Sequence, residues 1–161
     1  MEIRIIQFLA IILTALALVP GGAHALELAH KMALDRDQYM MVQSIYRGWA
    51  WLGTVFVGAL MANGLLAVRT RRQATPSASA ALATVLIAVA LAVFFTWTYP
   101  ANQATGNWTI TTTDWTTLRV QWEYSHAAAA ALVFLALCAT TVSVLTWSRL
   151  PPARPGILSP R

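Results

Sequence analysis

Four long apolar runs dominate the sequence, and each is long enough to cross the hydrocarbon core of a membrane. A helix rises about 1.5 Å per residue, so roughly 20 apolar residues span about 30 Å. The runs predict spans over about residues 3–30, 45–68, 78–98 and 118–147. With 58% hydrophobic and 11% charged residues, the chain is too apolar for a water-soluble domain. We therefore expect an all-α membrane protein in which residues 1–148 form a four-transmembrane-helix bundle.

The basic residues near the ends of these runs predict the orientation of the chain. Lys31, Arg36, Arg47 and Arg119 fall on one side. A larger group falls on the side that holds both termini: Arg4, Arg69, Arg71, Arg72, Arg149, Arg154 and Arg161. The positive-inside rule places both termini in the cytoplasm, and we expect a multi-pass protein of a bacterial inner membrane. Topology thus accounts for the net charge of +5, and we expect a lipid bilayer around the chain and no nucleic acid partner.

The N-terminal run has an alternative interpretation as a secretory signal. Arg4 would be its basic region, Ile5–Val19 its apolar core and Ala23-His24-Ala25 its cleavage site. Cleavage there would leave three spans and remove His24. The helical pattern continues past Ala25, which favours retention.

Two segments outside the spans are also distinctive. Residues 149–161 are rich in proline and predict a disordered cytoplasmic tail. Residues 99–117 are rich in Thr, Asn and Trp and predict an ordered outer loop between the third and fourth helices. A short extended piece is expected at Thr109–Thr113.

Ionisable residues gather near the outer ends of the first and fourth runs. On a helical wheel, His24, Glu27 and Lys31 share one stripe, whereas His30 is turned by about 120° from His24. Arg119, Glu123 and His126 form a matching stripe in the fourth run, at positions i, i+4 and i+7. The two stripes lie at the same predicted depth. Ionisable groups at such depth are costly and mark functional sites.

Other polar and aromatic residues are expected to converge on the same layer. Tyr39, Gln43 and Tyr46 share one face of the segment before the second run, which we assign to the second helix, and Asn102 follows the third run. We predict a site whose catalytic residues are His24, Glu27, Glu123 and His126. The expected substrate contacts are Gln43, Tyr46, Asn102, Trp122 and Arg119.

Several of these motifs resemble those of a known family. AHALELAHKMALDRDQYMMVQSIYRGWAWLG, together with TYPANQATGNWT and DWTTLRVQWEYSHA, resembles the DUF1772 family of small four-helix membrane proteins, which is related to the anthrone oxygenases. The resemblance covers about His24 to Leu145. It implies a four-span bundle and, for some relatives, oxygenation of a lipophilic aromatic substrate without a well-established cofactor.

The residue types allow three kinds of chemistry. Glu-x-x-His occurs at Glu27 and at Glu123, but the two further carboxylates of a di-iron bundle are missing from the spans. A mononuclear Fe, Cu or Zn site at His24, Glu27, Glu123 and His126 is stereochemically reasonable. A bis-histidine haem is a weaker alternative. The third route needs no metal, because His126 or His24 would act as a base on an activated aromatic.

A purely structural role is the remaining alternative. Arg119 with Glu123, and Glu27 with Lys31, are i, i+4 pairs that could simply satisfy one another. Two hypotheses follow: a membrane oxidoreductase or oxygenase acting on a lipophilic aromatic, and a non-catalytic membrane component that binds a small lipophilic ligand or supports a partner complex.

Overall fold

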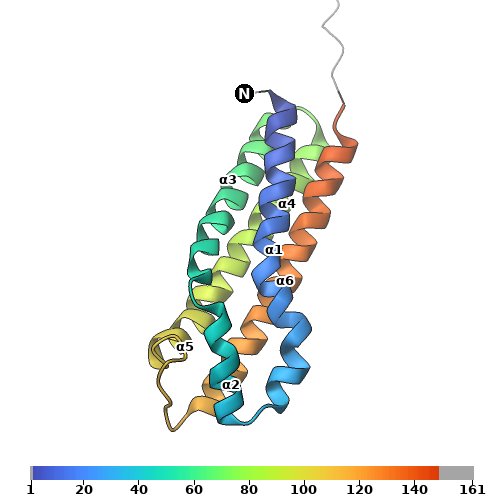
Figure 1. Ribbon diagram of the computed structural model, residues 1–161. Helices are drawn as coiled ribbons and strands as arrows, with labels where there is room; N and C mark the ends of the chain where they lie inside the picture. Colours follow the sequence, from blue (N-terminus) through green and yellow to red (C-terminus); the bar gives the residue numbers. More distant parts are fainter. Residues whose placement is uncertain (1, 149–161) are drawn as a thin grey trace, which may run out of the picture.

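The structure is a computed structural model that describes residues 2–148. It confirms an all-α architecture, with helices long and apolar enough to cross a membrane at Ile3–Ala33, Trp49–Arg69, Ala74–Ala104 and Trp115–Thr146. Figure 1 shows these spans side by side, with the start of the first and the end of the fourth at the same end of the bundle. The chain is thus an integral multi-pass membrane protein. The predicted disordered tail, 149–161, lies outside the described residues.

The four spans pack in a ring. Helix α1 (Ile3–Ala33) contacts α3 (Gly53–Arg69) and α6 (Trp115–Thr146), and α4 (Ala74–Val93) contacts the same two. Each spanning helix therefore has two neighbours and keeps a broad apolar face outward, as expected for a bundle surrounded by lipid.

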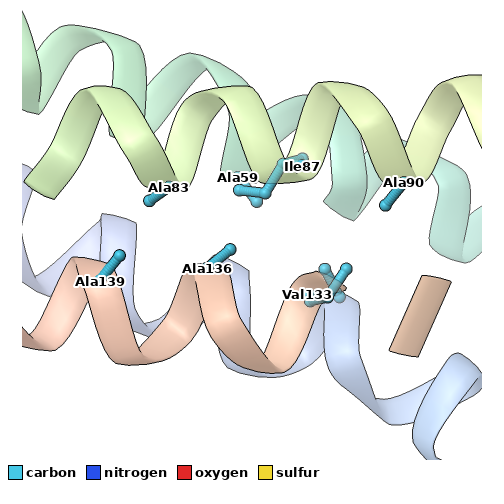
Figure 2. Close-up of a cluster of buried hydrophobic side chains, with 8 residues drawn as sticks. Ala59, Ala83, Ile87, Ala90, Val133, Ala136 and Ala139 are labelled. Atoms are coloured by element: carbon cyan, nitrogen blue, oxygen red, sulfur yellow. The ribbon is translucent and has the colours of Figure 1, made fainter. Parts of the chain in front are cut away.

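Small side chains line the axis of the bundle. Ala17, Ala59, Ala83, Ala90 and Ala136 are almost completely buried and pack around Ile87 and Val133. Figure 2 shows the α4 and α6 members of this cluster pointing toward one another. Lipid tails are as apolar as leucine, so membrane helices associate through close van der Waals contact, which small residues permit.

A polar contact ties three spans together within this apolar region. The Asn63 amide of α3 donates to the Thr14 hydroxyl of α1 at 2.9 Å, and the Thr140 hydroxyl of α6 donates to the Asn63 carbonyl oxygen at 2.7 Å. All three residues are completely buried. Because every member has a partner, this group serves packing between helices.

The segment before the second span differs from the prediction. The second spanning helix begins at Trp49, with a 3-10 turn η2 (Trp49–Leu52) leading into α3. Before it lie a short helix α2 (Arg36–Gln43) and a 3-10 turn η1 (Ser44–Tyr46). Asp35 caps α2 by a reciprocal capping box with Gln38, and Gly48 closes the segment with φ +90°. We call Asp35–Gly48 the cap segment. Tyr39, Gln43 and Tyr46 therefore belong to this segment and not to the second transmembrane helix.

The third span is longer than predicted. From Ala74, α4 continues through a π-helical stretch η3 (Phe94–Thr98) into α5 (Tyr99–Ala104). The loop to α6 is accordingly reduced to residues 105–114. The expected extended piece at Thr109–Thr113 was wrong, because within the described chain this stretch forms no strand and consists of turns, a bend and two residues without regular structure. A hydroxyl-rich segment without a strand to pair with gains more from local turns.

Helix α1 is continuous through Ala23-His24-Ala25, the cleavage site of the signal interpretation. His24 is buried there within the bundle. Retention of residues 1–25 remains a prediction.

Candidate functional site

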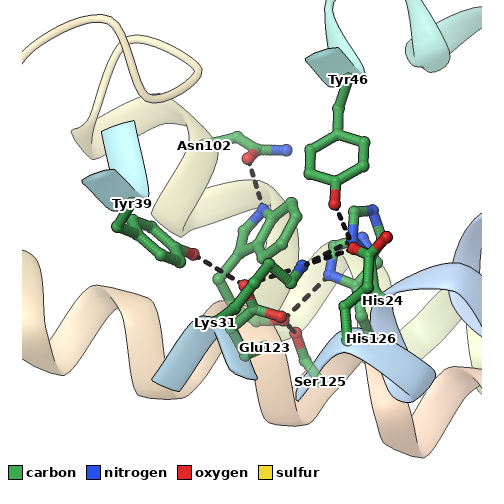
Figure 3. Close-up of polar contacts among 10 residues, drawn as sticks. His24, Lys31, Tyr39, Tyr46, Asn102, Glu123, Ser125 and His126 are labelled. Atoms are coloured by element: carbon green, nitrogen blue, oxygen red, sulfur yellow. Dashed lines mark hydrogen bonds and ion pairs between the residues drawn. The ribbon is translucent and has the colours of Figure 1, made fainter. Parts of the chain in front are cut away.

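The end of the bundle that lies under the cap segment holds a buried polar network. From α1 it takes His24, Glu27 and Lys31, which lie on one face as the wheel predicted, whereas His30 is exposed. From α6 it takes Glu123, which is completely buried, and His126. Figure 3 shows His24 and Lys31 converging with Glu123 and His126 between α1 and α6.

Lys31 is the centre of the network. Its Nζ lies 3.0 Å from Glu123 Oε1, 3.6 Å from Glu27 Oε2 and 2.9 Å from His24 Nδ1. The three N–H donors of an ammonium group are thus matched by three acceptors. The Lys31 side chain is only 4% exposed. Its charge also lies 5.1 Å from the Tyr46 ring centre and 5.2 Å from that of Trp122, within the range of cation–π attraction.

The sequence did not identify Lys31 as a site residue, although helical geometry placed it on the same stripe as His24 and Glu27. The sequence interpretation treated it as an interfacial partner of Glu27, and that pair is present at 3.6 Å. What the sequence does not show is that Glu123, from a helix far later in the chain, approaches Lys31 more closely than Glu27 does.

The cap segment donates two phenols to the two carboxylates. The Tyr39 hydroxyl donates to Glu123 Oε1 at 3.0 Å, and the Tyr46 hydroxyl donates to Glu27. Burial, followed by the neighbouring Glu123 carboxylate, raises the pKa of Tyr39. Burial and the hydrogen bond to Glu27 raise the pKa of Tyr46. Both phenols are therefore neutral donors that tie the cap segment to α1 and α6.

Arg119, predicted as a substrate contact, does not form the i, i+4 pair with Glu123 that the structural alternative allowed. Its guanidinium donates to the Leu34 carbonyl at 2.8 Å and lies 4.6 Å from the Trp115 ring centre. The i, i+4 pairing failed because Glu123 turns toward Lys31, in the interior, while Arg119 closes the end of α1. Arg119 therefore helps hold the turn that leads into the cap segment.

Aromatic residues from α6 and from the loop between α5 and α6 form the wall of the site. Asn102 Oδ1 accepts a hydrogen bond of 2.7 Å from Trp122 Nε1, which fixes the indole of Trp122. Trp108 packs edge-on against Tyr39 and Trp122, with ring centres 5.1 Å and 5.8 Å apart. The loop reaches this position through three successive residues with positive φ, Gly106, Asn107 and Trp108.

The two histidines lie against each other and against this wall. The ring centres of His24 and His126 are 4.5 Å apart, and His126 lies 4.0 Å from the Trp122 ring centre. This contact leaves no space for a porphyrin between the two imidazoles, so the arrangement does not favour a bis-histidine haem.

The geometry also does not favour the predicted mononuclear metal. His24, Glu27 and Glu123 all direct a donor atom at Lys31 Nζ, so the ammonium group occupies the position that a cation would take. Among residues 2–148, no three His, Cys, Asp or Glu side chains are arranged to hold a metal ion.

Among the described residues, four buried polar atoms in and around the site lack a protein partner: Glu123 Oε2, Gln43 Nε2, Trp108 Nε1 and Arg119 Nε. An unsatisfied buried acceptor and donor are costly and are expected to be completed by a bound molecule or by water.

The centre of the site is closed in this structure, although the Glu27 side chain at its edge is 43% exposed. His24 and Lys31 are each 3% exposed and Glu123 is fully covered. Two shallow hollows on the described surface, at Trp51 and Val57 and at Asp35 and Trp115, do not include the network residues. A ligand must therefore displace part of the cap segment or enter between helices.

Comparison of the chain with protein-family models, with curated proteins and with solved structures gave no match.

Proposed function

We propose that this membrane protein is an oxidoreductase of the oxygenase type, acting on a lipophilic aromatic molecule at the capped end of its bundle. The observation that carries the proposal is the buried network of Lys31, Glu123 and His24 beside His126. An ionisable residue in a membrane span is a functional-site candidate by default. Here several share one layer and adjoin a wall of Trp and Tyr rings, which suits a flat apolar substrate.

The chemistry we propose is base catalysis by His126. A conjugated CH2 group next to an aromatic ketone loses a proton to the imidazole, and the electron pair stays in the conjugated system. Molecular oxygen then reacts with the carbanion. Overall, CH2 and O2 give C=O and H2O, so one oxygen atom enters the product and the other leaves as water. The resemblance to the DUF1772 family supports this class of reaction and this substrate class.

The orphaned atoms of the site support ligand binding. Glu123 Oε2 can accept from a substrate hydroxyl, and Gln43 Nε2 can donate to a substrate oxygen.

Turnover by purified protein tests the proposal. Protein in lipid nanodiscs is supplied with anthrone, and oxygen uptake and anthraquinone formation are followed together, with protein-free nanodiscs as the background. We expect His126→Asn to lower the protein-dependent rate by about 100-fold or more, the contribution of a general base. Folding should change little, because the substitution removes one hydrogen bond of about 1 kcal/mol.

His30→Asn is the matched control, because His30 is an exposed histidine on the same helix as His24. Its rate should equal that of the unsubstituted chain. If no protein-dependent oxygen uptake occurs, or if His126→Asn keeps the full rate, this reaction is excluded.

A second candidate is a non-catalytic membrane component that binds a small lipophilic ligand. The closed ion network favours it, because Lys31 and its acceptors largely satisfy one another. In that case anthrone would stabilise the protein toward heat without being turned over.

A further inference from the structure

We infer that Lys31 is a positioning residue that fixes the proton of His24 on Nε2, so that the two adjacent histidines have opposite hydrogen-bonding characters. The consequence for catalysis rests on the proposed function. The positions of the protons on His24 and His126 do not depend on that function, and they can be measured in the protein alone.

The tautomer of His24 follows from its partner. Lys31 Nζ lies 2.9 Å from His24 Nδ1, and an ammonium group can only donate. Nδ1 must therefore accept, which leaves the ring proton of a neutral imidazole on Nε2. The carboxylates of Glu123 and Glu27, at 3.0 Å and 3.6 Å, hold the Lys31 ammonium group in place.

The tautomer of His126 is the reverse. Its Nδ1 lies 2.9 Å from the Trp122 carbonyl oxygen, which can only accept. Nδ1 therefore carries the proton, and Nε2 is the atom at which the ring can take another. Ser125 also donates to this carbonyl, at 2.9 Å, so the acceptor is anchored on both sides (Figure 3).

Together the rings offer a donor and a base in one wall. With their centres 4.5 Å apart, His126 Nε2 can take a proton from a bound molecule while His24 Nε2–H donates to an oxygen on the same molecule. In the proposed reaction the electron pair left by the proton moves onto that oxygen, where the hydrogen bond stabilises it. The site therefore suits a molecule whose acidic C–H or O–H is conjugated with a carbonyl group.

Nuclear magnetic resonance of the imidazole nitrogens tests the inference directly. The chain has only three histidines, so protein labelled with 15N-histidine gives three sets of ring signals. The variants His24→Asn, His30→Asn and His126→Asn assign them. Near neutral pH we expect a proton on Nε2 of His24 and on Nδ1 of His126. A proton on Nδ1 of His24, or on both of its nitrogens, would overturn the inference.

The role of Lys31 is tested by Lys31→Met in the same spectra. We expect the Nδ1 signal of His24 to move to the position of a nitrogen without a hydrogen bond, while the His30 signals stay in place. Lys31→Met/Glu123→Gln serves where the single variant does not fold, because it leaves no unpaired carboxylate on α6. Unchanged His24 signals in the folded variant would show that Lys31 does not position this ring.

Measuring turnover distinguishes a failure of this inference from a failure of the proposed function. If both hold, Lys31→Met lowers kcat by about 100-fold, the cost of misplacing a reacting group, with a smaller change in KM. If the tautomers are as expected but the unsubstituted chain does not oxidise anthrone, the proposed reaction fails and the inference stands.

Discussion

At the scale of single residues, the site is organised by charge balance around one ammonium group. Lys31 faces two carboxylates, of which Glu123 is fully buried and Glu27 is 43% exposed. Removing one partner of a buried ion pair leaves an unpaired charge, whereas removing both charges together costs much less.

We therefore predict that Lys31→Met lowers the free energy of unfolding by about 3–5 kcal/mol. Lys31→Met/Glu123→Gln should recover most of this loss, because the introduced amide can still accept from Tyr39 without carrying a charge. Denaturant titration of the purified variants measures both values. Arg36→Met is the control, since Arg36 pairs with Asp37 at the exposed surface and such a pair is worth about 0–1 kcal/mol. If the losses in the free energy of unfolding simply added in the double variant, the pairing of Lys31 with Glu123 would be contradicted.

The phenol of Tyr39 gives a prediction at alkaline pH. Its pKa is raised in the folded state, so the folded protein holds this proton more tightly than the unfolded chain does. The resulting stability is complete below about pH 10, the ordinary tyrosine value, and declines as the pH rises above it.

The absorbance of phenolate is followed as the pH is raised, for the unsubstituted chain and for Tyr39→Phe. The difference between the two curves should show no step near the ordinary tyrosine pKa of about 10 while the helices remain intact. Circular dichroism on the same samples reports the helices. A step at that pH in the folded protein would mean that Tyr39 is not buried against Glu123.

At the scale of the helices, the site depends on the close approach of α1 and α6. At Gly21 an added Cβ would lie 3.4 Å from Cα and Cβ of Ala130. A side chain larger than that of alanine therefore has no room between the helices there. His24 and Lys31 follow on the same helix, and their distances to α6 depend on this contact.

We predict that Gly21→Leu separates α1 from α6 and breaks the Lys31–Glu123 pair, lowering both stability and any activity. Overpacking of this kind typically costs about 1–3 kcal/mol. Gly22→Leu is the matched control, because an added Cβ there meets only Leu18 of the same helix, at 3.9 Å. Thermal unfolding of the two variants compares them, and equal losses would argue against close packing at Gly21.

At the scale of the whole molecule, the two ends of the bundle differ in charge. The end that holds the N-terminus carries Arg4, Arg69, Arg71 and Arg72. At the capped end Lys31 is buried against carboxylates and Arg36 is paired with Asp37. Basic residues near the ends of spans favour the cytoplasmic side, so we propose that both termini are cytoplasmic.

Labelling of single cysteines in intact bacterial cells tests this orientation. In a Cys138→Ser background, Thr113→Cys at the capped end should react with a membrane-impermeant maleimide. Thr75→Cys, at the other end, should react only after the membrane is made permeable. Both positions are exposed. The opposite pattern would reverse the proposed topology.

The sequence by itself determined the architecture of the bundle. Helix formation within apolar runs of this length depends on local hydrogen bonding and on the width of the bilayer, so the four spans could be predicted from hydropathy alone. The stripe of His24, Glu27 and Lys31, and the matching stripe on the last span, also followed from helical geometry.

Only the tertiary structure decided which charges meet. Arg119 and Lys31 were both available to Glu123, and helical spacing favoured Arg119. The rotation of α1 against α6, set by contacts such as Gly21 with Ala130, brings Lys31 to 3.0 Å from the Glu123 carboxylate. The cap segment likewise could not be separated from the second span, because Tyr39 finds its acceptor on α6, 84 residues later, and Tyr46 finds its acceptor 19 residues earlier, on α1. Side-chain partners across helices depend on distances that no local pattern encodes.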